Sequence, residues 1–263
     1  MHVREDTAGA TAELAELVRG AGSVVALTGA GISTPSGIPD FRSPGTGLWE
    51  TVDPMEVAHI DAFRRDPARF WSFYSARFAA LESKRPNPAH RALAELERRG
   101  LLDAVITQNV DMLHRAAGTR ELVEVHGSIA TCSCLDCHSD HASPTEPVVL
   151  AEARARIRED PDGIPRCERC RAPLKPDVVL FGELLRERTL ERARALCEGA
   201  DALLCIGSSL EVYPVATLPL LTHERGGAVA ILTEGPTPLD ALAAVRLHGD
   251  VVAELDALLA ALS

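Results

Sequence analysis

A glycine-rich turn directly after a short apolar run constrains this fold more than any other feature of the sequence. Residues 24–27 are apolar and few enough to form a buried strand, and Gly29 and Gly31 follow them. Glycine lets the backbone turn sharply and approach a ligand closely. Backbone N–H groups in such a turn can bind a pyrophosphate. We therefore expect a nucleotide to bind at the end of this strand.

The segment after the turn differs from the usual dinucleotide fingerprint. A G-x-G-x-x-G pattern would place glycine at position 34, where this chain has threonine. Proline at 35 and 39 and glycine at 37 then interrupt any helix. We expect a structured loop that ends in Asp40, Phe41 and Arg42. An acid, an aromatic ring and a cation at a nucleotide site suggest chemistry on the nucleotide.

Short apolar runs alternate with helical patterns, which is typical of an α/β fold with a doubly wound parallel sheet. The further strands are expected at 104–107, 122–125, 202–206 and 228–232. Helices are expected at 12–18, from 67, from 88 to 100, at 111–117 and at 253–262. Asp66 and Asn87 each precede a proline, so we expect them to cap two of these helices.

Charge and composition exclude several functional classes. The net charge of −11 argues against nonspecific binding to nucleic acid. No apolar run reaches the roughly 18 residues that a membrane span needs, and residues 1–11 do not resemble a secretion signal. We expect a cytoplasmic protein with neither nucleic-acid nor membrane partners. Its seven cysteines, an odd number, then favour metal binding over disulfides.

Two C-x-x-C pairs supply four candidate metal ligands: Cys134, Cys137, Cys167 and Cys170. Four thiolates give Zn²⁺ a closed tetrahedral shell, and a closed shell is structural. Cys132 could replace Cys134, and His138 and His141 are also nearby. The two-residue gap of each pair favours Cys134.

The zinc pairs lie in one of two segments that interrupt the alternation of strands and helices. Residues 49–85 have a helical pattern, and residues 130–176 hold the cysteine pairs. We assign both segments to a smaller domain with a helical and a zinc-binding module. Residues 1–48, 86–129 and 177–263 form the larger, Rossmann-like domain.

Polar residues follow three of the expected strands, where ligands bind in open α/β sheets. They are Gln108, Asn109 and Asp111, then His126, then Gly207, Ser208 and Ser209. Asp111 could also cap the next helix, and the two roles can coexist. Histidine titrates near neutral pH, so His126 suits a general base, whereas we place His114 among structural histidines.

Taken together, these motifs resemble those of the sirtuins, which are NAD-dependent protein lysine deacylases. The resemblance is carried by residues 29–33, 36–42 and 107–111, by His126 with Gly127, by the cysteine pairs, and by residues 176–183 and 207–214. It extends from about residue 18 to the C-terminus and points to the bacterial type.

The resemblance implies that NAD and an acyl-lysine peptide meet in a cleft between the two domains. It implies NAD contacts from Gly29, Ala30, Gly31, Ser33, Thr34, Asp40, Phe41, Arg42, Gln108, Asn109, Val110, Asp111, Gly207, Ser208, Ser209, Thr233, Glu234 and Asp250. It implies that the substrate backbone pairs as an added strand with Val179, Leu180, Phe181, Gly182 and Glu183. His126 is the implied catalytic base.

In the implied reaction, the amide oxygen of acyl-lysine attacks the anomeric carbon of the nicotinamide ribose as nicotinamide leaves. A pocket that excludes water protects the cationic transition state. His126 then removes a proton from the ribose hydroxyls, so that a ribose oxygen attacks the bound acyl carbon. After addition of water, the products are free lysine, nicotinamide and O-acyl-ADP-ribose.

Two residues depart from the family's pattern. Thr233 stands where sirtuins commonly have an asparagine that contacts the adenosine ribose, and Ser208 stands where threonine is usual. A hydroxyl at 233 can still bind ribose, but we expect NAD affinity to differ.

A tyrosine–arginine pair bears on the acyl group. Tyr74 and Arg77 lie three residues apart on one helix face. A Tyr-x-x-Arg pair here resembles the sirtuins that remove succinyl, malonyl or glutaryl groups, since a guanidinium can bind the acyl carboxylate. The alternative is that Tyr74 packs in the core and Arg77 lies in solvent. Residues 34–35 and 40–43 resemble the deacetylase branch instead.

We therefore expect two activities, deacetylation and Arg77-dependent removal of acidic acyl groups. The substrates are acylated proteins, with acyl-CoA synthetases as a candidate class. A mono-ADP-ribosyltransferase or a non-catalytic NAD-sensing module would share the NAD site. His126 and the peptide-pairing segment favour deacylation over both.

Overall fold

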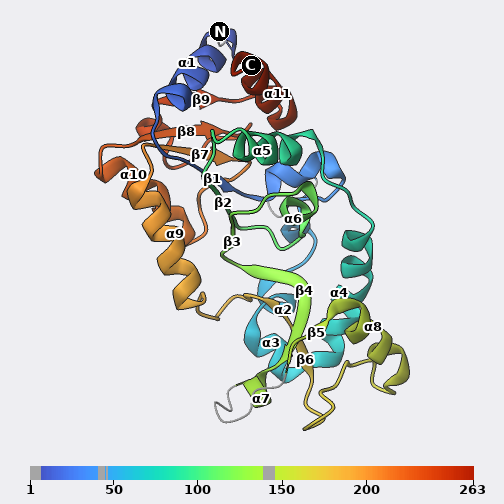
Figure 1. Cartoon of the computed structure of the whole chain (residues 1–263). Coiled ribbons are helices and arrows are strands. Elements are labelled where there is room, and N and C mark those ends of the chain that lie inside the picture. The colour runs from blue at the N-terminus through green and yellow to red at the C-terminus, as the bar shows by residue number, and fades with distance from the viewer. Residues whose placement is uncertain (1–6, 41–44, 46, 139–145) are drawn as a thin grey trace.

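A six-stranded parallel sheet forms the centre of the larger part of the molecule (Figure 1). The structure is a computed structural model and describes residues 7–40, 45, 47–138 and 146–263. The strand order is β3-β2-β1-β7-β8-β9, and each neighbouring pair is parallel. The bounds are β1 (Val24–Thr28), β2 (Ala104–Thr107), β3 (Leu122–Glu124), β7 (Ala202–Ile206), β8 (Ala228–Leu232) and β9 (Val245–Leu247).

This order confirms the doubly wound sheet. The chain winds outward from β1 in one direction and then from β7 in the other, so the order reverses between β1 and β7. The five expected strands are present within one residue of their expected ends. We did not expect β9, because its three residues include Arg246 and give no apolar run.

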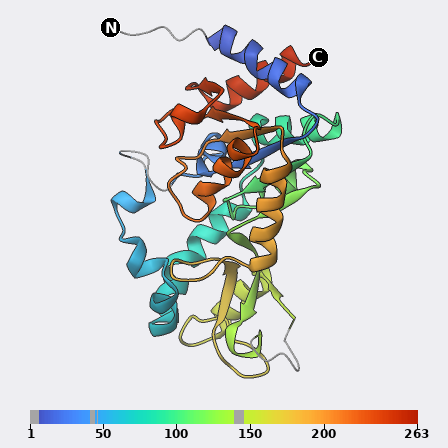
Figure 2. The ribbon, with the colours of Figure 1, turned by 90° about the vertical axis from the view of Figure 1, so that its left-hand side faces the viewer.

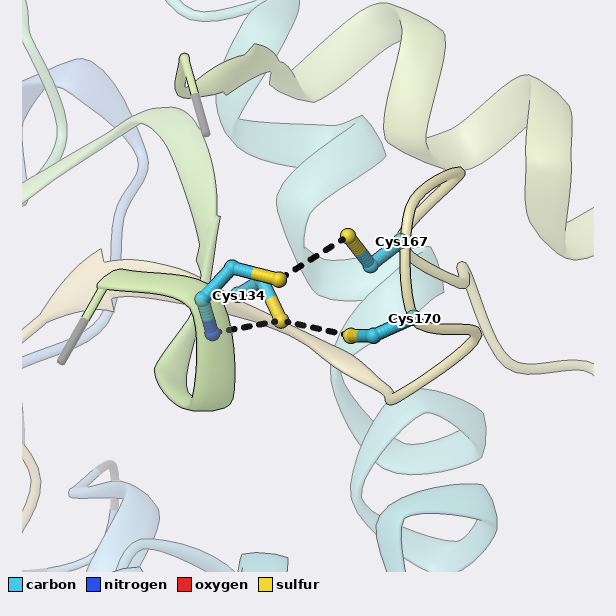
Figure 3. Close-up of side chains that lie close together, drawn as sticks. Cys134, Cys167 and Cys170 are labelled. Atoms are coloured by element: carbon cyan, nitrogen blue, oxygen red, sulfur yellow. Dashed lines mark hydrogen bonds between the residues drawn. The ribbon is translucent and has the colours of Figure 1, made fainter. Parts of the chain in front are cut away.

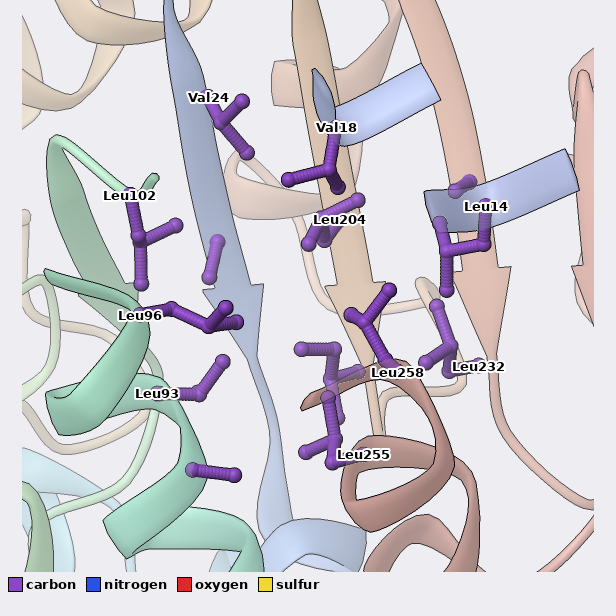
Figure 4. Close-up of a cluster of buried hydrophobic side chains, with 14 of the residues drawn as sticks. Leu14, Val18, Val24, Leu93, Leu96, Leu102, Leu204, Leu232, Leu255 and Leu258 are labelled. Carbon is purple, nitrogen blue, oxygen red and sulfur yellow. The ribbon is translucent and has the colours of Figure 1, made fainter. Parts of the chain in front are cut away.

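Helices cover both faces of the sheet. On one face lie α1 (Thr7–Gly20), α5 (Pro88–Arg98) and α11 (Val251–Ala261), whose leucines pack on alternate strand residues such as Val24 and Ala26 (Figure 4). On the other face, α9 (Glu187–Gly199) and α10 (Leu218–Glu224) pack against Val25 and Leu27. Successive residues of β1 therefore serve opposite cores, as the period of a strand requires.

Side-chain caps fix where the helices begin. Asp66 accepts the Arg69 N–H at the start of α4 (Pro67–Glu82), and Asn87 accepts the Ala89 N–H at the start of α5. Both expected caps are thus confirmed. Asp250 caps α11, which begins two residues before the expected position. Helix α6 (Leu113–Ala117) ends at a glycine with φ of 96°.

The smaller part has a sheet and a core of its own (Figure 2). Its three antiparallel strands have the order β5-β4-β6, with β4 (Gly127–Cys134), β5 (Val148–Val149) and β6 (Leu174–Val178). The helices here are α2 (Pro54–Val57), α3 (Ile60–Arg65), α4, α7 (Leu135–His138) and α8 (Leu150–Glu159). Trp71 of α4 donates to the carbonyl oxygen of Leu174, 2.9 Å away, and so joins the two expected modules. Our domain boundaries stay a proposal, which this separate core supports.

The segment after β1 is more regular than the loop that we expected. Residues Ala30–Ser36 form a 3₁₀ helix, η1, which ends where Gly37 adopts φ of 74°. Proline at 35 lies inside this short helix, so it does not prevent the helix from forming as we expected. Further 3₁₀ turns are η2 (Leu48–Glu50), η3 (Val215–Thr217) and η4 (Asp240–Leu242). Among the described residues, no helix is long and apolar enough to cross a membrane.

Candidate functional site

Two glycine loops touch at the point where the strand order reverses. The Gly31 N–H, just after β1, donates to the Gly207 carbonyl oxygen, just after β7, over 2.8 Å. A Cβ on Gly29 would lie 2.8 Å from that same oxygen, and one on Gly31 would lie 2.8 Å from Gly207 Cα. Both positions therefore require glycine, because a side chain at either one would collide with the neighbouring loop. Our sequence explanation, which invoked only a turn and a ligand, was incomplete.

A cavity of about 1210 Å³ opens at these strand ends and extends to the smaller part. It is lined by most of the residues to which the sequence assigned NAD contacts: Gly29, Ala30, Gly31, Thr34, Asp40, Gln108, Asn109, Val110, Gly207, Ser208, Ser209, Thr233, Glu234 and Asp250. The sequence-assigned substrate residues 179–183, Tyr74 and His126 also line it. Phe41 and Arg42 lie outside the described residues.

Ser33 and Asp111 lie behind the cavity wall instead of lining it. The Ser33 hydroxyl donates to Asp111 Oδ2 over 2.6 Å, and Asn109 Nδ2 lies 3.2 Å from the same hydroxyl and 3.0 Å from the Gly29 carbonyl oxygen. Asp111 Oδ1 also accepts the Leu113 N–H at the start of α6, although Met112 occupies the N-cap position of this helix. Burial raises the pKa of Asp111, against the effect of these hydrogen bonds. The network fixes the positions of Asn109 and of the glycine turn.

His126 is held in one tautomer. Its Nδ1 lies 3.0 Å from the Gln108 carbonyl oxygen, which can only accept, so Nδ1 carries the proton. The lone pair is then on Nε2. Burial lowers the pKa of His126, partly opposed by the hydrogen bond to Gln108. The imidazole is thus neutral near pH 7 and able to accept a proton. A Cβ on the next residue, Gly127, would lie 2.0 Å from the Asp177 carbonyl oxygen, so only glycine leaves room for that oxygen.

The segment 179–183 connects His126 to the smaller part. The Val179 N–H donates to the His126 carbonyl oxygen over 2.8 Å. The Phe181 N–H donates to the Ala58 carbonyl oxygen, and the Phe181 carbonyl oxygen accepts from Ile60, both at 2.9 Å. Val212, Tyr213 and Pro214 also line the cavity, and Tyr213 is 75% exposed. We missed these three as site residues, although they lie in the segment 207–214 that carried the resemblance.

The four cysteines of the two C-x-x-C pairs converge in the smaller part, and Figure 3 shows Cys134, Cys167 and Cys170 among them. All their sulfur atoms lie within 4.8 Å of one another, with Cys134 to Cys170 at 3.4 Å and Cys137 to Cys167 at 4.0 Å. Sulfurs around a tetrahedral zinc are about 3.8 Å apart, given Zn–S distances of about 2.3 Å. The donor set and spacing therefore fit zinc. Cys132, the alternative ligand, is buried in the core, and burial raises its pKa to about 12.

Comparison with known proteins decides the family. The model of the Sir2 family matches residues 29–214. This chain belongs to the Sir2 family. An NAD-dependent protein deacetylase of Caldivirga maquilingensis is 46% identical over 235 residues, 89% of this chain and 87% of the relative. An NAD-dependent protein deacylase of Thermococcus kodakarensis is 43% identical, with 92% of each chain covered. Membership of the Sir2 family makes the chain an enzyme.

A solved Sir2 structure agrees with this assignment. That structure holds a deacetylated p53 peptide and 3′-O-acetyl ADP ribose. It matches this chain with a TM-score of 0.87 and 36% sequence identity. The match covers 94% of this chain and 96% of the other. The Sir2 relatives named above come from archaea, so the bacterial type that we expected is not confirmed.

A pair of buried histidines lies behind the sirtuin site. The rings of His90 and His114 are 4.8 Å apart, His114 Nε2 lies 3.0 Å from the Thr28 hydroxyl, and His90 Nε2 lies 3.4 Å from the Ser33 hydroxyl. Burial lowers the pKa of His90 to about 4 and that of His114 to about 3. This environment fits the structural role that we expected for His114. We did not identify His90 as a buried structural histidine. Its place in the first turn of α5, next to the capping residue Asn87, could have indicated that role.

Tyr74 lines the cavity at the strand ends, whereas Arg77 does not. Tyr74 lines it, stacked on Phe78 with ring centroids 5.2 Å apart, and burial raises the pKa of Tyr74 to about 12. The Arg77 guanidinium instead lies 3.6 Å from the centre of the Phe73 ring and donates to the Phe73 carbonyl oxygen. The two side chains share a helix face, as the spacing predicted, but they do not converge on the cavity.

Proposed function

We propose that this chain is an NAD-dependent protein lysine deacylase that removes acetyl groups and transfers them to ADP-ribose, with release of nicotinamide. The observation that carries the proposal is His126, a neutral base with its proton held on Nδ1. It lies between the glycine loops and the segment 179–183, in one continuous cavity. The names of the relatives, deacetylase and deacylase, support the same activity.

The cavity fits NAD. It lies at the carboxyl ends of β1, β7 and β8, at the reversal of strand order where dinucleotides bind. Residues of the glycine loops would bind the phosphates, with Gln108 and Asn109 toward the nicotinamide half. Thr233, Glu234 and Asp250, which follow β8 and β9, would hold the adenosine. When bound, NAD supplies the anomeric carbon that the acyl oxygen attacks and the ribose that receives the acyl group.

The chain's own residues then have distinct tasks. His126 Nε2 accepts a proton from a ribose hydroxyl, so that this oxygen can attack the acyl carbon. The Gln108 carbonyl oxygen keeps the imidazole oriented while its charge changes. Phe70, Tyr74 and Phe78, whose rings line the cavity together, exclude water from the acyl group.

We further propose that the enzyme removes succinyl and malonyl groups through Arg77. Tyr74 lines the cavity, which supports this activity. Arg77 lies over the Phe73 ring, so the activity requires the Arg77 side chain to move. The guanidinium must leave the Phe73 ring and turn toward the acyl carboxylate. Arg77 is exposed, so this movement requires no change in the core.

A panel of acyl-lysine peptides tests both proposals. Acetyl, succinyl, malonyl and longer acyl peptides are incubated with and without NAD, and free lysine is measured. We expect NAD-dependent removal of acetyl in the parent protein and in Arg77→Met, and loss of desuccinylation in Arg77→Met alone. Tyr74→Phe keeps the ring packing and removes one hydroxyl, so we expect it to lower desuccinylation and to spare deacetylation. Equal effects of Arg77→Met on both acyl groups would refute the role of Arg77.

We also propose one structural zinc on the four cysteines, a cytoplasmic location, and acyl-CoA synthetases among the substrates. Free thiols and a thiolate zinc site suit a reducing compartment, which supports the cytoplasm.

A further inference from the structure

Lys175 is a buried lysine beside the segment that we propose to bind the peptide. It is 5% exposed, and its ammonium group has three acceptors. These are the carbonyl oxygens of Pro176 at 3.0 Å and Val178 at 2.6 Å and the Glu183 carboxylate at 3.0 Å. An ammonium group has three protons, so its hydrogen-bonding capacity is filled. A buried charge this fully satisfied is costly to disturb.

Glu183, at the other end of the segment, contacts both Lys175 and the backbone of the segment. Its Oε2 binds Lys175 and also accepts the Leu180 N–H over 2.9 Å. The Glu183 N–H in turn donates to the Leu180 carbonyl oxygen over 3.0 Å, and Gly182 adopts φ of 82° between them. Residues 180–183 therefore form a turn closed by the side chain of its last residue.

The ion pair holds the backbone of Val178, just before the segment, and that of Leu180 within it. Lys175 holds the Val178 carbonyl oxygen, and Glu183 holds the Leu180 N–H. Between and beyond them, Val179 is held by His126, and Phe181 by Ala58 and Ile60. The backbones of residues 178–181 are thus fixed by hydrogen bonds. These bonds determine which edge of the segment faces the cavity. An added strand binds only to an edge with the correct register and direction.

We propose that the Lys175–Glu183 ion pair is a positioning device that sets the affinity for the acyl-lysine peptide and leaves NAD binding unaffected. The inference rests on the proposed function, because it takes the segment 179–183 as the peptide-binding strand. Lys175 itself is absent from the cavity lining, so it acts through the segment and not by touching the peptide.

Binding and kinetics of matched variants test the proposal. Binding of a fluorescent acetyl-lysine peptide is measured by anisotropy, and KM is measured separately for peptide and for NAD. Lys175→Met should weaken peptide binding about tenfold, or about 1.4 kcal/mol, with an unchanged KM for NAD. Glu183→Gln, which keeps an acceptor for the Leu180 N–H, should weaken it less. Lys175→Arg should restore most of the affinity.

A destabilising change elsewhere provides the control for mere loss of stability. Glu97, buried in the larger part, accepts the backbone N–H groups of Arg120 and Glu121. Glu97→Gln should lower the melting temperature without changing the peptide affinity. If Lys175→Met does not fold, the smaller effect of Glu183→Gln decides the question.

Peptide affinity that is unchanged in Glu183→Gln and Lys175→Met, or that falls equally in Glu97→Gln, would overturn the positioning role. Failure of the proposed function would look different. The parent protein would bind the acetyl peptide but release no lysine with NAD, and the effect of the ion pair on peptide binding would still be measured.

Discussion

The side chain of His126 and the backbone of Gln108 form the hydrogen bond on which the proposed chemistry depends, with Nδ1 3.0 Å from the carbonyl oxygen. The bond joins the loop after β2 to the loop after β3. Since these strands are neighbours in register, the sheet itself sets the distance between base and acceptor. The tautomer with the proton on Nδ1 is therefore a consequence of the fold.

The first prediction concerns the pH dependence of this base. His126 must be neutral to accept a proton, and burial lowers its pKa from the usual 6.5. Activity should thus be full above pH 6.5 and fall as the pH drops through the lower pKa. A profile of kcat/KM from acid to neutral pH would show this limb. An acid limb above pH 6.5 would contradict the assignment.

A variant without the imidazole tests the same residue. His126→Ala should lower kcat by about 10²–10⁴-fold and leave NAD binding intact.

The second prediction concerns the stability conferred by the neutral histidine pair. The pKa of His114 is lowered to about 3 and that of His90 to about 4, whereas an unfolded chain titrates near 6.5. Between pH 6.5 and 4 the unfolded state binds more protons, so stability falls as the pH drops. His90 alone accounts for roughly 3 kcal/mol of this loss. Asp111, with its raised pKa, acts in the opposite sense and offsets part of it.

Thermal unfolding at several pH values tests the histidine pair. His114→Gln, whose amide can still bind the Thr28 hydroxyl, should flatten the dependence of melting temperature on pH between 6.5 and 4. His223→Gln, at an exposed histidine of α10, is the control and should change nothing. A slope in His114→Gln equal to that of the parent would show that the pair does not titrate as described.

The third prediction concerns the metal. Cys170→Ser should abolish zinc binding, measured by elemental analysis of the purified protein, and lower the melting temperature, because thiolate zinc sites stabilise the folds that they close. Cys132→Ala should keep the zinc and lose stability only through the space left in the core. Retention of zinc by Cys170→Ser, or its loss from Cys132→Ala, would assign the ligands differently.

Much of the fold follows from local signals in the sequence. Asp66 and Asn87 mark helix starts because each side chain binds a backbone N–H two or three residues ahead. The apolar runs mark buried strands because parallel strands covered on both faces have no polar side. The cysteine pairs indicate zinc because their spacing fixes the ligand geometry.

Other features depend on contacts between distant segments. The contact of Gly31 with Gly207 follows from the adjacency of β1 and β7, which no local pattern states. The strand β6 contains Pro176 and pairs with β4 across more than forty residues, so its sequence does not read as a strand. Arg77 has the expected spacing from Tyr74, but its contact with Phe73 depends on the rotamer and not on the spacing.

The fate of the acyl group tests the central claim most directly. The purified protein is incubated with NAD and an acetyl-lysine peptide, and the products are identified by mass spectrometry. We predict free lysine peptide, nicotinamide and O-acetyl-ADP-ribose in equal amounts, with formation of free lysine peptide and O-acetyl-ADP-ribose slowed about 10²–10⁴-fold in His126→Ala. ADP-ribose attached to the protein or the peptide, with the acetyl group still on lysine, would contradict the account and indicate an ADP-ribosyltransferase.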